Sequence, residues 1–485
     1  MSVGQVVTSD QPRDGIYWCG GDERWTPPDV TPLTDAIQAD LCIVGGGFTG
    51  LWTALYVKRL APKTDVVLVE QTVCGLGASG RNGGWVNGWE DALPSLVARF
   101  GADPARWLVE QSLEGVREIG RAVAEGGLDC DFVMNSGLEI ALSEAQMARF
   151  EEDAEEREKH GTAHLVELLD AEQAKAACGS PRALGGVVLK TAGGVQPALL
   201  AQGLRRLAVE AGVRVFEASP MTRLRQSAPA VVETPAGCVT AQKVVLASGA
   251  WTAQVSELRR TVFVIPAHIV ATSPSAAILD EMGWQRGRPF ADGRTAVHYG
   301  QRTVDDRLVF GRGGGRLGYA GRVIPSHFHD KANAESIVAD MRALFPATGG
   351  LTVEWRWGGP VERTQHGFPW VGTLGRARNI HYGIGYGGNG VAPSNLIGRT
   401  LASVARERDD DHARSPLVSG PPSYLPPEPF RFVGARAMRS AIERYEILED
   451  EGKKPDPVSN FLRRGLGLTV PKGIEVSKVL RRDDD

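Results

Sequence analysis

The sequence lacks any long hydrophobic run. No stretch of about 18 consecutive apolar residues, the length that a membrane-spanning helix needs, occurs in it. Residues 1–14 also lack the charged-then-apolar order of a secretory signal. These two absences predict a protein that neither spans a membrane nor is secreted, and we expect it in the cytoplasm.

Motifs for metal binding are missing as well. The cysteines are Cys19, Cys42, Cys74, Cys130, Cys178 and Cys238. They are scattered, and none forms a C-x-x-C pair with another. This spacing predicts no metal site and suits a reducing compartment.

A strong charge of one sign is also absent. The formal net charge of −4 over 485 residues indicates neither nucleic-acid binding nor membrane binding as the main role. Hydrophobic residues make up 42% and charged residues 23%, which is typical of a soluble globular protein. The length predicts two domains or a discontinuous pair.

What the sequence does contain is a glycine-rich turn between a strand and a helix. Residues 41–44 are apolar and β-favouring, and Gly45, Gly47 and Gly50 follow in the spacing G-x-G-x-x-G. The first glycine permits a tight turn, the second the close approach of a pyrophosphate, and the third the packing of helix on strand. A helix that begins near Phe48 would direct its unpaired N–H groups at an anion.

An acidic residue follows at the distance that a dinucleotide site requires. A second apolar strand at residues 66–69 ends on Glu70, about 20 residues after Gly50. A carboxylate there can accept hydrogen bonds from an adenosine ribose. The alternative is a doubly wound fold that binds no nucleotide, but the turn, helix and acidic residue together favour a bound dinucleotide.

Glycine turns recur along the chain. Residues 74–85 include five glycines and indicate either a segment that approaches a ligand or a flexible surface loop. Residues 243–251 repeat the strand-to-glycine pattern, which predicts one nucleotide domain interrupted by inserts. The turn at 385–390, before a helix predicted at 392–405, is a second possible anion site.

The other segments carry fewer signals. Trp18 and Trp25 predict that the irregular N-terminal arm packs over the body, since tryptophans seldom stay in water. Short strands are expected at 262–265, 296–299 and 307–310, with Arg312 directly beyond the last. The Pro-rich residues 420–429 are typical of a linker. The tail predicts one amphipathic helix with Met438, Ile442 and Tyr445 on a shared face.

Taken together, these motifs resemble the D-amino-acid oxidase and glycine oxidase superfamily of FAD-dependent amine oxidoreductases. The resemblance spans residues 39 to about 405. Its segments are the glycine turn with Glu70, residues 77–84, Val195-Gln-Pro197, residues 244–251, Trp357-Gly-Gly-Pro360 and Gly387-Gly-Asn-Gly390. The form Ala78-Ser-Gly-Arg-Asn-Gly-Gly84 is most similar to the branch that contains γ-glutamylputrescine oxidoreductase.

The resemblance implies an α/β fold in which a discontinuous, Rossmann-like FAD-binding domain accompanies a mixed-sheet α+β substrate domain, with the flavin ring between them. The implied segments are an N-terminal arm at 1–38, FAD-binding parts at 39–90, 186–255 and 356–405, substrate-domain parts at 91–185 and 256–355, and a linker with a helical tail at 406–485.

The resemblance also implies roles for the motif residues. Gly45, Gly47, Gly50 and Glu70 would hold the ADP half of FAD. Ser79, Arg81, Asn82 and Gly83 would line the flavin, and Gly388, Asn389 and Gly390 would lie near its pyrimidine edge. The implied set is completed by Phe48, Thr49, Gln71, Gly84, Ser248, Gly249 and Val391.

Two departures from the family pattern stand out. His366 occupies a position, in Thr364-Gln-His-Gly-Phe-Pro369, where the family often has an acidic or amide residue. The family's monomeric sarcosine oxidases tether flavin through a cysteine in the C-terminal half, and this chain has no cysteine after Cys238. We therefore expect FAD to be bound non-covalently, with no metal.

The implied reaction is oxidation of a primary or secondary amine, such as an amino acid, a polyamine derivative or an aminophosphonate-like compound. Hydride would pass to flavin N5, water would hydrolyse the imine, and oxygen or an electron carrier would reoxidise the flavin. This chemistry needs no strong general base, in agreement with the lack of a conspicuous acid–base pair in the sequence.

Five residues are candidates for the substrate side: His298, Tyr299, Arg312, Trp357 and His366. Tyr299 is either a binding group or a core tyrosine with a wet hydroxyl. Arg312 is either a bidentate clamp for a carboxylate or phosphonate or a member of a surface salt bridge. For His366 a structural role is favoured over a catalytic one.

Two other functions remain open at the level of sequence. One is an FAD-dependent 2-hydroxy-acid dehydrogenase or oxidase, since the same superfamily includes hydroxy-acid and glycerol-phosphate flavoenzymes. The other is a flavin-binding redox or assembly protein without turnover.

Overall fold

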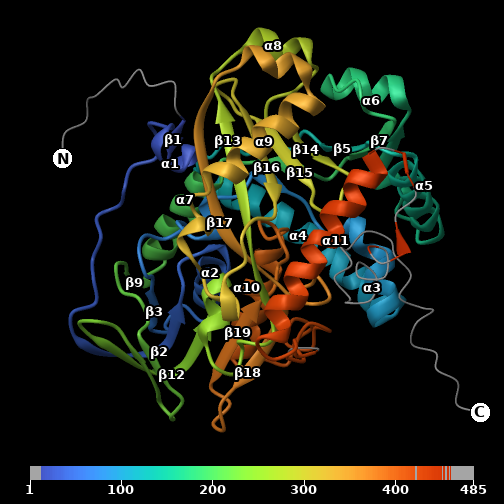
Figure 1. The fold of residues 1–485 in the computed structure, drawn as a ribbon. Coiled ribbons are helices and arrows are strands. Elements are labelled where there is room, and N and C mark those ends of the chain that lie inside the picture. The colour runs from blue at the N-terminus through green and yellow to red at the C-terminus, as the bar shows by residue number, and fades with distance from the viewer. Residues whose placement is uncertain (1–11, 421–422, 451, 454–455, 458, 460–485) are drawn as a thin grey trace, which may run out of the picture.

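The computed structural model describes residues 12–420, 423–450, 452–453, 456–457 and 459 (Figure 1). Parts of the predicted arm (1–11), linker (421–422) and tail (460–485) lie outside these residues. Within the described part of the chain, no helix combines the length and the apolar character that crossing a bilayer requires.

The first of the two large sheets carries the predicted glycine turn. Its strands are β2 (Ala36–Val44), β3 (Val66–Val69), β9 (Arg214–Phe216), β10 (Arg223–Arg225), β11 (Ala230–Glu233), β12 (Cys238–Leu246), β18 (Trp370–Leu374) and β19 (Ile380–Ile384). The order is β10-β11-β12-β2-β3-β9, and β19 joins β12 to β18. Its inner pairs, β12–β2, β2–β3, β3–β9 and β12–β19, are parallel. Since distant parts of the chain form one sheet, the prediction of a discontinuous Rossmann-like domain is confirmed.

Helices from four parts of the chain share the apolar core of this sheet. They are α2 (Phe48–Leu60), α4 (Ala102–Gly126), α7 (Pro197–Glu210) and α10 (Pro393–Ala405). Small residues allow close packing: a Cβ on Gly398 of α10 would lie 2.6 Å from Cβ of Trp52 in α2. Because α3 (Leu93–Phe100) and α4 pack here, the segment predicted at 91–185 is divided between the two sheets.

The second sheet is mixed, as expected for the substrate domain. Its order is β1 (Arg13–Asp14), β17 (Val353–Arg363), β13 (Phe263–Thr272), β16 (Leu308–Gly313), β15 (His298–Arg302), β14 (Pro289–Asp292), β5 (Gly137–Ala141), β7 (Gly185–Leu189) and β6 (Val166–Leu169). Helices α5 (Glu144–Lys159), α6 (Ala171–Cys178), α8 (Ala276–Glu281) and α9 (Lys331–Leu344) accompany it (Figure 1).

Strand β17 crosses a predicted domain boundary. It pairs with β13 from Val353 to Arg363, so the sheet continues past the boundary expected between residues 355 and 356. The boundary at 38/39 likewise lies within β2, which begins at Ala36. The ends of β17 and β2 are set by how far their neighbours β13 and β12 continue to form backbone hydrogen bonds with them. The local sequence does not show this.

The N-terminal arm packs on the body, as expected. Its short helix α1 (Tyr17–Gly20) buries Trp18, which is 2% exposed and donates a hydrogen bond to the Asn82 carbonyl at 2.8 Å. Strand β1 pairs in parallel with β17. The arm thereby braces a segment of the predicted flavin-lining loop.

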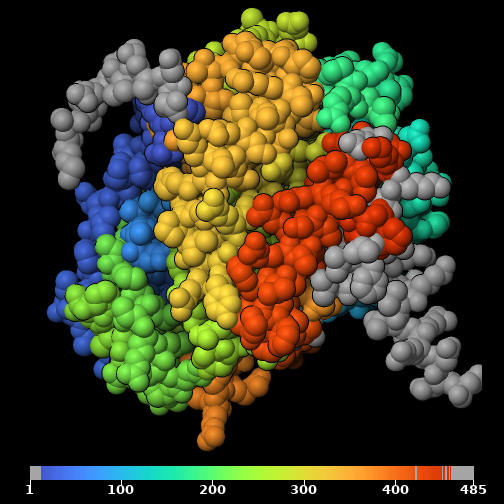
Figure 2. All heavy atoms as spheres, in the orientation of Figure 1, coloured from blue at the N-terminus to red at the C-terminus, as the bar shows by residue number. Residues whose placement is uncertain are grey.

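The tail contains the predicted amphipathic helix, α11 (Phe430–Asp450). Met438 and Tyr445 are buried, and Ile442 is half-buried on the same side. Figure 2 shows α11 lying along the surface of the body, beside the segment that follows β16.

Candidate functional site

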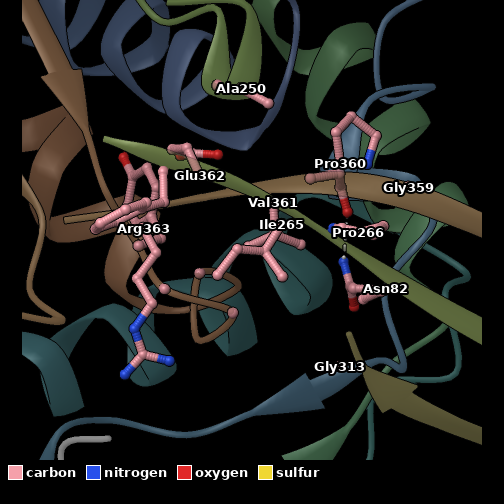
Figure 3. Close-up of a pocket in the computed structure, with 18 of the residues that line it drawn as sticks. Asn82, Ala250, Ile265, Pro266, Gly313, Gly359, Pro360, Val361, Glu362 and Arg363 are labelled. Atoms are coloured by element: carbon pink, nitrogen blue, oxygen red, sulfur yellow. Dashed lines mark hydrogen bonds between the residues drawn. The ribbon is translucent and has the colours of Figure 1, made fainter. Parts of the chain in front are cut away.

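An elongated cavity of about 1430 Å³ lies between the two sheets. Its walls come from the carboxyl ends of β2, β3 and β12, from residues 77–92, from β13 and β15–β17, and from α11. Figure 3 shows Ile265 of β13 and Val361 of β17 projecting into it. All the cofactor residues expected from the sequence line this cavity except Gly50 and Gly84.

The first glycine turn is built as its spacing indicates. Gly45 has φ +110°, and a Cβ there would lie 2.4 Å from the Ala247 carbonyl oxygen of the neighbouring strand. A Cβ on Gly50 would lie 1.9 Å from the Gly45 carbonyl oxygen, so Gly50 acts in packing behind the cavity wall. Helix α2 begins directly after Gly47, and its Phe48 N–H donates to Ser79 Oγ at 2.8 Å.

Glu70 stabilises this turn. Its Oε2 accepts a hydrogen bond from the Gly46 N–H at 2.8 Å, and its Oε1 accepts one from the Thr72 N–H at 3.0 Å. Burial raises the pKa of Glu70 while these N–H groups oppose the rise. The carboxylate thus braces the loop and also borders the cavity.

The loop at residues 78–84 is held by both sheets and by the arm. Arg81 donates from Nε to the Leu76 carbonyl at 2.6 Å and from Nη1 to the Gly358 carbonyl at 3.1 Å. Asn82 donates to the Ser79 carbonyl at 2.6 Å and accepts from the Gly84 N–H at 2.8 Å. These contacts hold the loop in a defined position on the cavity wall. The alternative of a flexible surface loop, which the sequence had left open, is not observed.

The second glycine turn borders the same cavity. Gly388 has φ +102°, and an added Cβ would meet no atom within 4 Å, so its backbone faces open space. Helix α10 begins soon after it, at Pro393. Tyr386 in this turn hydrogen-bonds through its hydroxyl to Thr49 Oγ1 at 2.5 Å, which ties the two glycine turns together.

These features fit an elongated dinucleotide with a ring system at one end. A turn without side chains and the start of a long helix suit a pyrophosphate. The cavity continues past the rigid loop to the second helix start, and its volume exceeds that of an ordinary small-molecule pocket, about 300–1,000 Å³.

Comparison with known proteins agrees with this geometry. The sequence model of the DAO family, described as FAD dependent oxidoreductase, matches residues 40–404. The chain belongs to this family. It is therefore an FAD-dependent oxidoreductase, and FAD is the dinucleotide that the cavity fits.

The relatives cover most of the chain. The γ-glutamylputrescine oxidoreductase of Escherichia coli (strain K12) is 32% identical over 426 residues, which is 86% of this chain and 96% of that protein. The crystal structure of glycine oxidase from Geobacillus kaustophilus has a TM-score of 0.64 at 21% identity and covers 79% of this chain and 99% of its own. The FAD-bound L-α-glycerophosphate oxidase from Mycoplasma pneumoniae has a TM-score of 0.59 at 14% identity and covers 76% and 95%.

Two of the five substrate-side candidates, Tyr299 and Arg312, line the cavity. Tyr299 packs its ring so close to Gly83 that a Cβ there would lie 2.8 Å away. Burial raises the pKa of the Tyr299 hydroxyl, so it stays neutral, and within the described chain it has no hydrogen-bond partner. Its hydroxyl therefore borders the cavity beside the loop at residues 78–84.

Arg312 lies within β16, not beyond it as expected from the sequence. Its Nη1 forms an ion pair with Asp340 of α9, and its Nη2 donates to Ser336 Oγ at 3.4 Å. The guanidinium therefore already has a carboxylate partner. A bidentate clamp for a substrate anion would have to compete with Asp340.

His298 lies behind the wall in a charge chain. It is fully buried, with Nδ1 2.7 Å from Asp292 Oδ2 and Nε2 3.3 Å from Asp340 Oδ2. Burial lowers the pKa of His298, but the charge and hydrogen bond of Asp292 outweigh it, so the pKa is raised overall. His298 thus positions Asp340 and does not itself line the cavity.

Trp357 and His366 also lie outside the cavity lining. Trp357 is 2% exposed and donates from Nε1 to the Arg81 carbonyl at 2.8 Å, which supports the loop from behind. Burial, with a contribution from the nearby Arg99, lowers the pKa of His366 to about 4, so its imidazole is neutral at ordinary pH.

Sequence reasoning missed several carboxylates that line the cavity, among them Asp340, Glu362 and Glu446. Glu362 follows Val361 in β17 and is 4% exposed, and burial raises its pKa to about 7 (Figure 3). A charged residue inside a buried strand is a sequence signal for a functional site. It was missed at Glu362 because β17 was not expected to extend so far. Asp340 and Glu446 carry no such signal, because they are ordinary residues of amphipathic helices.

Proposed function

We propose that the enzyme oxidises a primary or secondary amine to an imine, which water then hydrolyses to a carbonyl compound. The observation that carries this proposal is the apolar surface beside the flavin-lining loop. Ile265 and Val361 project into the cavity there, and Tyr299 lines the same cavity. An apolar surface disfavours an ammonium ion and lowers the pKa of a bound amine, which leaves the nitrogen lone pair available.

The roles of the cofactor residues belong to the same proposal. Gly45, Gly47 and Glu70 would hold the ADP half, the loop at 79–83 would hold the flavin, and Gly388–Gly390 would lie at its pyrimidine edge. When bound, FAD supplies a two-electron acceptor for the substrate. The chain's own part is to orient the amine against Tyr299 and to exclude water from the reacting carbon.

The similarity to an oxidoreductase named for γ-glutamylputrescine supports an amine substrate, since that name denotes an amine. The similarity to a glycerophosphate oxidase is confined to the fold, at 14% identity, and keeps alcohol oxidation as the second candidate. Amine and 2-hydroxy-acid substrates differ in how they ionise. An amine loses its extra proton near pH 10 and reacts as the neutral base, whereas the reacting hydroxyl of a 2-hydroxy acid does not ionise in this range.

The test is anaerobic reduction of the flavin by panels of amines and of 2-hydroxy acids, followed by absorbance. We expect bleaching with at least one amine, at a rate that increases as the pH is raised through the pKa of the bound amine. Reduction by hydroxy acids and by no amine would select the second candidate. A flavin that no member of either panel reduces would overturn both candidates. Repeating the assay with oxygen and with dyes would distinguish an oxidase from a dehydrogenase.

A further inference from the structure

Helix α11 forms the outer wall of the cavity although it lies beyond the family match, which ends at residue 404. Its Met438, Ile442 and Glu446 line the cavity, as do residues 294–297. This wall is therefore an addition to the part of the chain that the family model describes.

The helix is fixed to the body along its length. Arg439 donates to the Gly315 carbonyl near its middle, and Asp450 pairs with Arg294 at 2.6 Å near its end. Between them, Glu446 Oε1 accepts a hydrogen bond from the Ala296 N–H at 2.6 Å. Side chains on α11 therefore hold defined positions against the cavity.

Several charges at this end of the cavity are paired. Arg312 pairs with Asp340, Arg294 pairs with Asp450, and His298 lies between Asp292 and Asp340. Glu446 forms no ion pair within the described residues, and the hydrogen bond that it accepts comes from a backbone N–H. It is a cavity-facing carboxylate that lacks a cation.

The surroundings of Glu446 favour a cation over water. Burial and the nearby Asp292 charge raise its pKa to about 7, while the Ala296 N–H, Arg294 and His298 oppose the rise. A carboxylate in such a site gains more from an added positive charge than one in water, because the interaction is less screened. Glu362 has a similar pKa but lies toward the cofactor end, beside the Gly249 turn, and accepts N–H groups of the second glycine turn.

We propose that Glu446 binds an ammonium group at the end of the substrate remote from the reacting carbon. The enzyme would then prefer amines that carry a second cationic nitrogen, such as diamines and their longer derivatives. The apolar side chains of Met438 and Ile442 would contact the methylene chain between the two nitrogens. This inference rests on the proposed function, because it names the substrate class of the same cavity.

The test measures binding without turnover. Holoenzyme reduced with dithionite under anaerobic conditions cannot oxidise an amine, so calorimetry can give the Kd of α,ω-diaminoalkanes of four to eight carbons and of the 1-aminoalkanes of equal length. At pH 8, where Glu446 is ionised, we expect at least one diamine to bind about tenfold more tightly than its monoamine. Glu446→Gln should abolish that ratio and leave the monoamine Kd unchanged, and Glu446→Asp should restore part of it.

Glu335→Gln serves as the matched control, since Glu335 lies on the exposed side of α9 and its side chain is 66% exposed. It should retain the wild-type ratio. Equal binding of diamines and monoamines at every length, or a diamine preference that survives in Glu446→Gln, would overturn the proposal. Neither result depends on whether the oxidised holoenzyme oxidises amines, so failure here is distinct from failure of the proposed function.

Discussion

At the scale of single residues, the cofactor site depends on backbone atoms that only glycine exposes. A Cβ on Gly47 would already lie 2.9 Å from Ser79 Oγ, the atom that accepts the Phe48 N–H. The turn thus has no room for a side chain between the start of α2 and the loop that faces it. This crowding makes Gly47 a sensitive position for cofactor binding.

Gly47→Val should therefore give protein that folds but holds little flavin. We expect the FAD-to-protein ratio to drop to below about a tenth of the wild-type value, because the valine occupies the approach of the pyrophosphate. The ratio is measured from the absorbance of flavin and protein. Gly349→Val is the control, since a Cβ at Gly349 meets no atom within 4 Å. Normal flavin content in Gly47→Val would show that the pyrophosphate binds elsewhere.

Glu362 gives a prediction about pH and stability. Burial raises its pKa from 4.5 to about 7, so the folded protein favours the protonated form. The stabilisation is fully present below about pH 4.5 and is lost as the pH rises through about 7; the difference corresponds to about 3 kcal/mol. We therefore expect the free energy of unfolding of the apoprotein, measured with urea, to decrease between pH 4.5 and pH 8. The decrease should be larger in wild type than in Glu362→Gln by about this amount.

The comparison for Glu362 is the exposed Glu335→Gln variant, whose stability should follow wild type across the whole pH range. Parallel pH curves for Glu362→Gln and wild type would mean that Glu362 has the same pKa in the folded and unfolded states.

The cysteines predict how FAD is held. All six lie within the described residues, and none lines the cavity. No thiol is therefore placed to form a thioether with the flavin. Acid precipitation should leave the yellow colour in the supernatant, and a denaturing gel should show no fluorescent protein band. A fluorescent band would contradict non-covalent binding.

At the scale of elements, a charge chain connects β14, β15, α9 and β16 through Asp292, His298, Asp340 and Arg312. Asp340 and Arg312 both border the cavity, so they set its electrostatic potential as a pair. Removing the Arg312 charge should raise the pKa of an amine bound in the cavity, and removing the Asp340 charge should lower it.

Arg312→Ala removes a positive charge and leaves Asp340 less compensated. The more negative potential favours ammonium, so the pH profile of anaerobic flavin reduction should move upward by up to about one unit. Asp340→Asn should move it downward. Stopped-flow reduction across pH measures both shifts. Arg286→Ala, which removes an exposed arginine outside the cavity lining, should leave the profile unchanged. An unchanged profile in both test variants would place the amine away from this pair.

At the scale of the whole molecule, the cavity joins two sheets that have separate cores. One wall comes from the glycine turns of the first sheet, and the other from β13, β15, β16 and β17 of the second. A ligand that spans this cavity contacts both cores at once. Its binding is therefore linked to the stability of the entire fold.

FAD should accordingly stabilise the apoprotein, by about 2.7 kcal/mol when its free concentration is 100 times its Kd. FMN, which lacks the adenylate half, cannot occupy the turn at Gly45–Gly50 and should stabilise less at the same concentration. Urea unfolding of apoprotein with FAD, with FMN and with AMP measures the difference. Equal stabilisation by FMN and FAD would indicate that the ADP half contributes nothing.

The sequence by itself determined the features that depend on local backbone chemistry. Gly45, Gly50 and Gly388 adopt conformations or close approaches that exclude side chains, and this requirement is visible in their spacing. The strands that precede the turns are local apolar runs, so the discontinuous α/β fold and FAD as the cofactor could also be predicted. Trp18 indicated a packed arm because an exposed indole is unfavourable.

Tertiary structure alone decided which charged groups meet the substrate cavity. Arg312 became a member of an ion pair because α9 brings Asp340 to it, and His298 turned inward between two carboxylates. The position of Glu446 depends on a tail helix that folds back over residues 294–297. His298 and Asp292 are six residues apart, but the other partners are separated by 28 to 150 residues, so their pairing depends on how whole elements pack rather than on any local pattern.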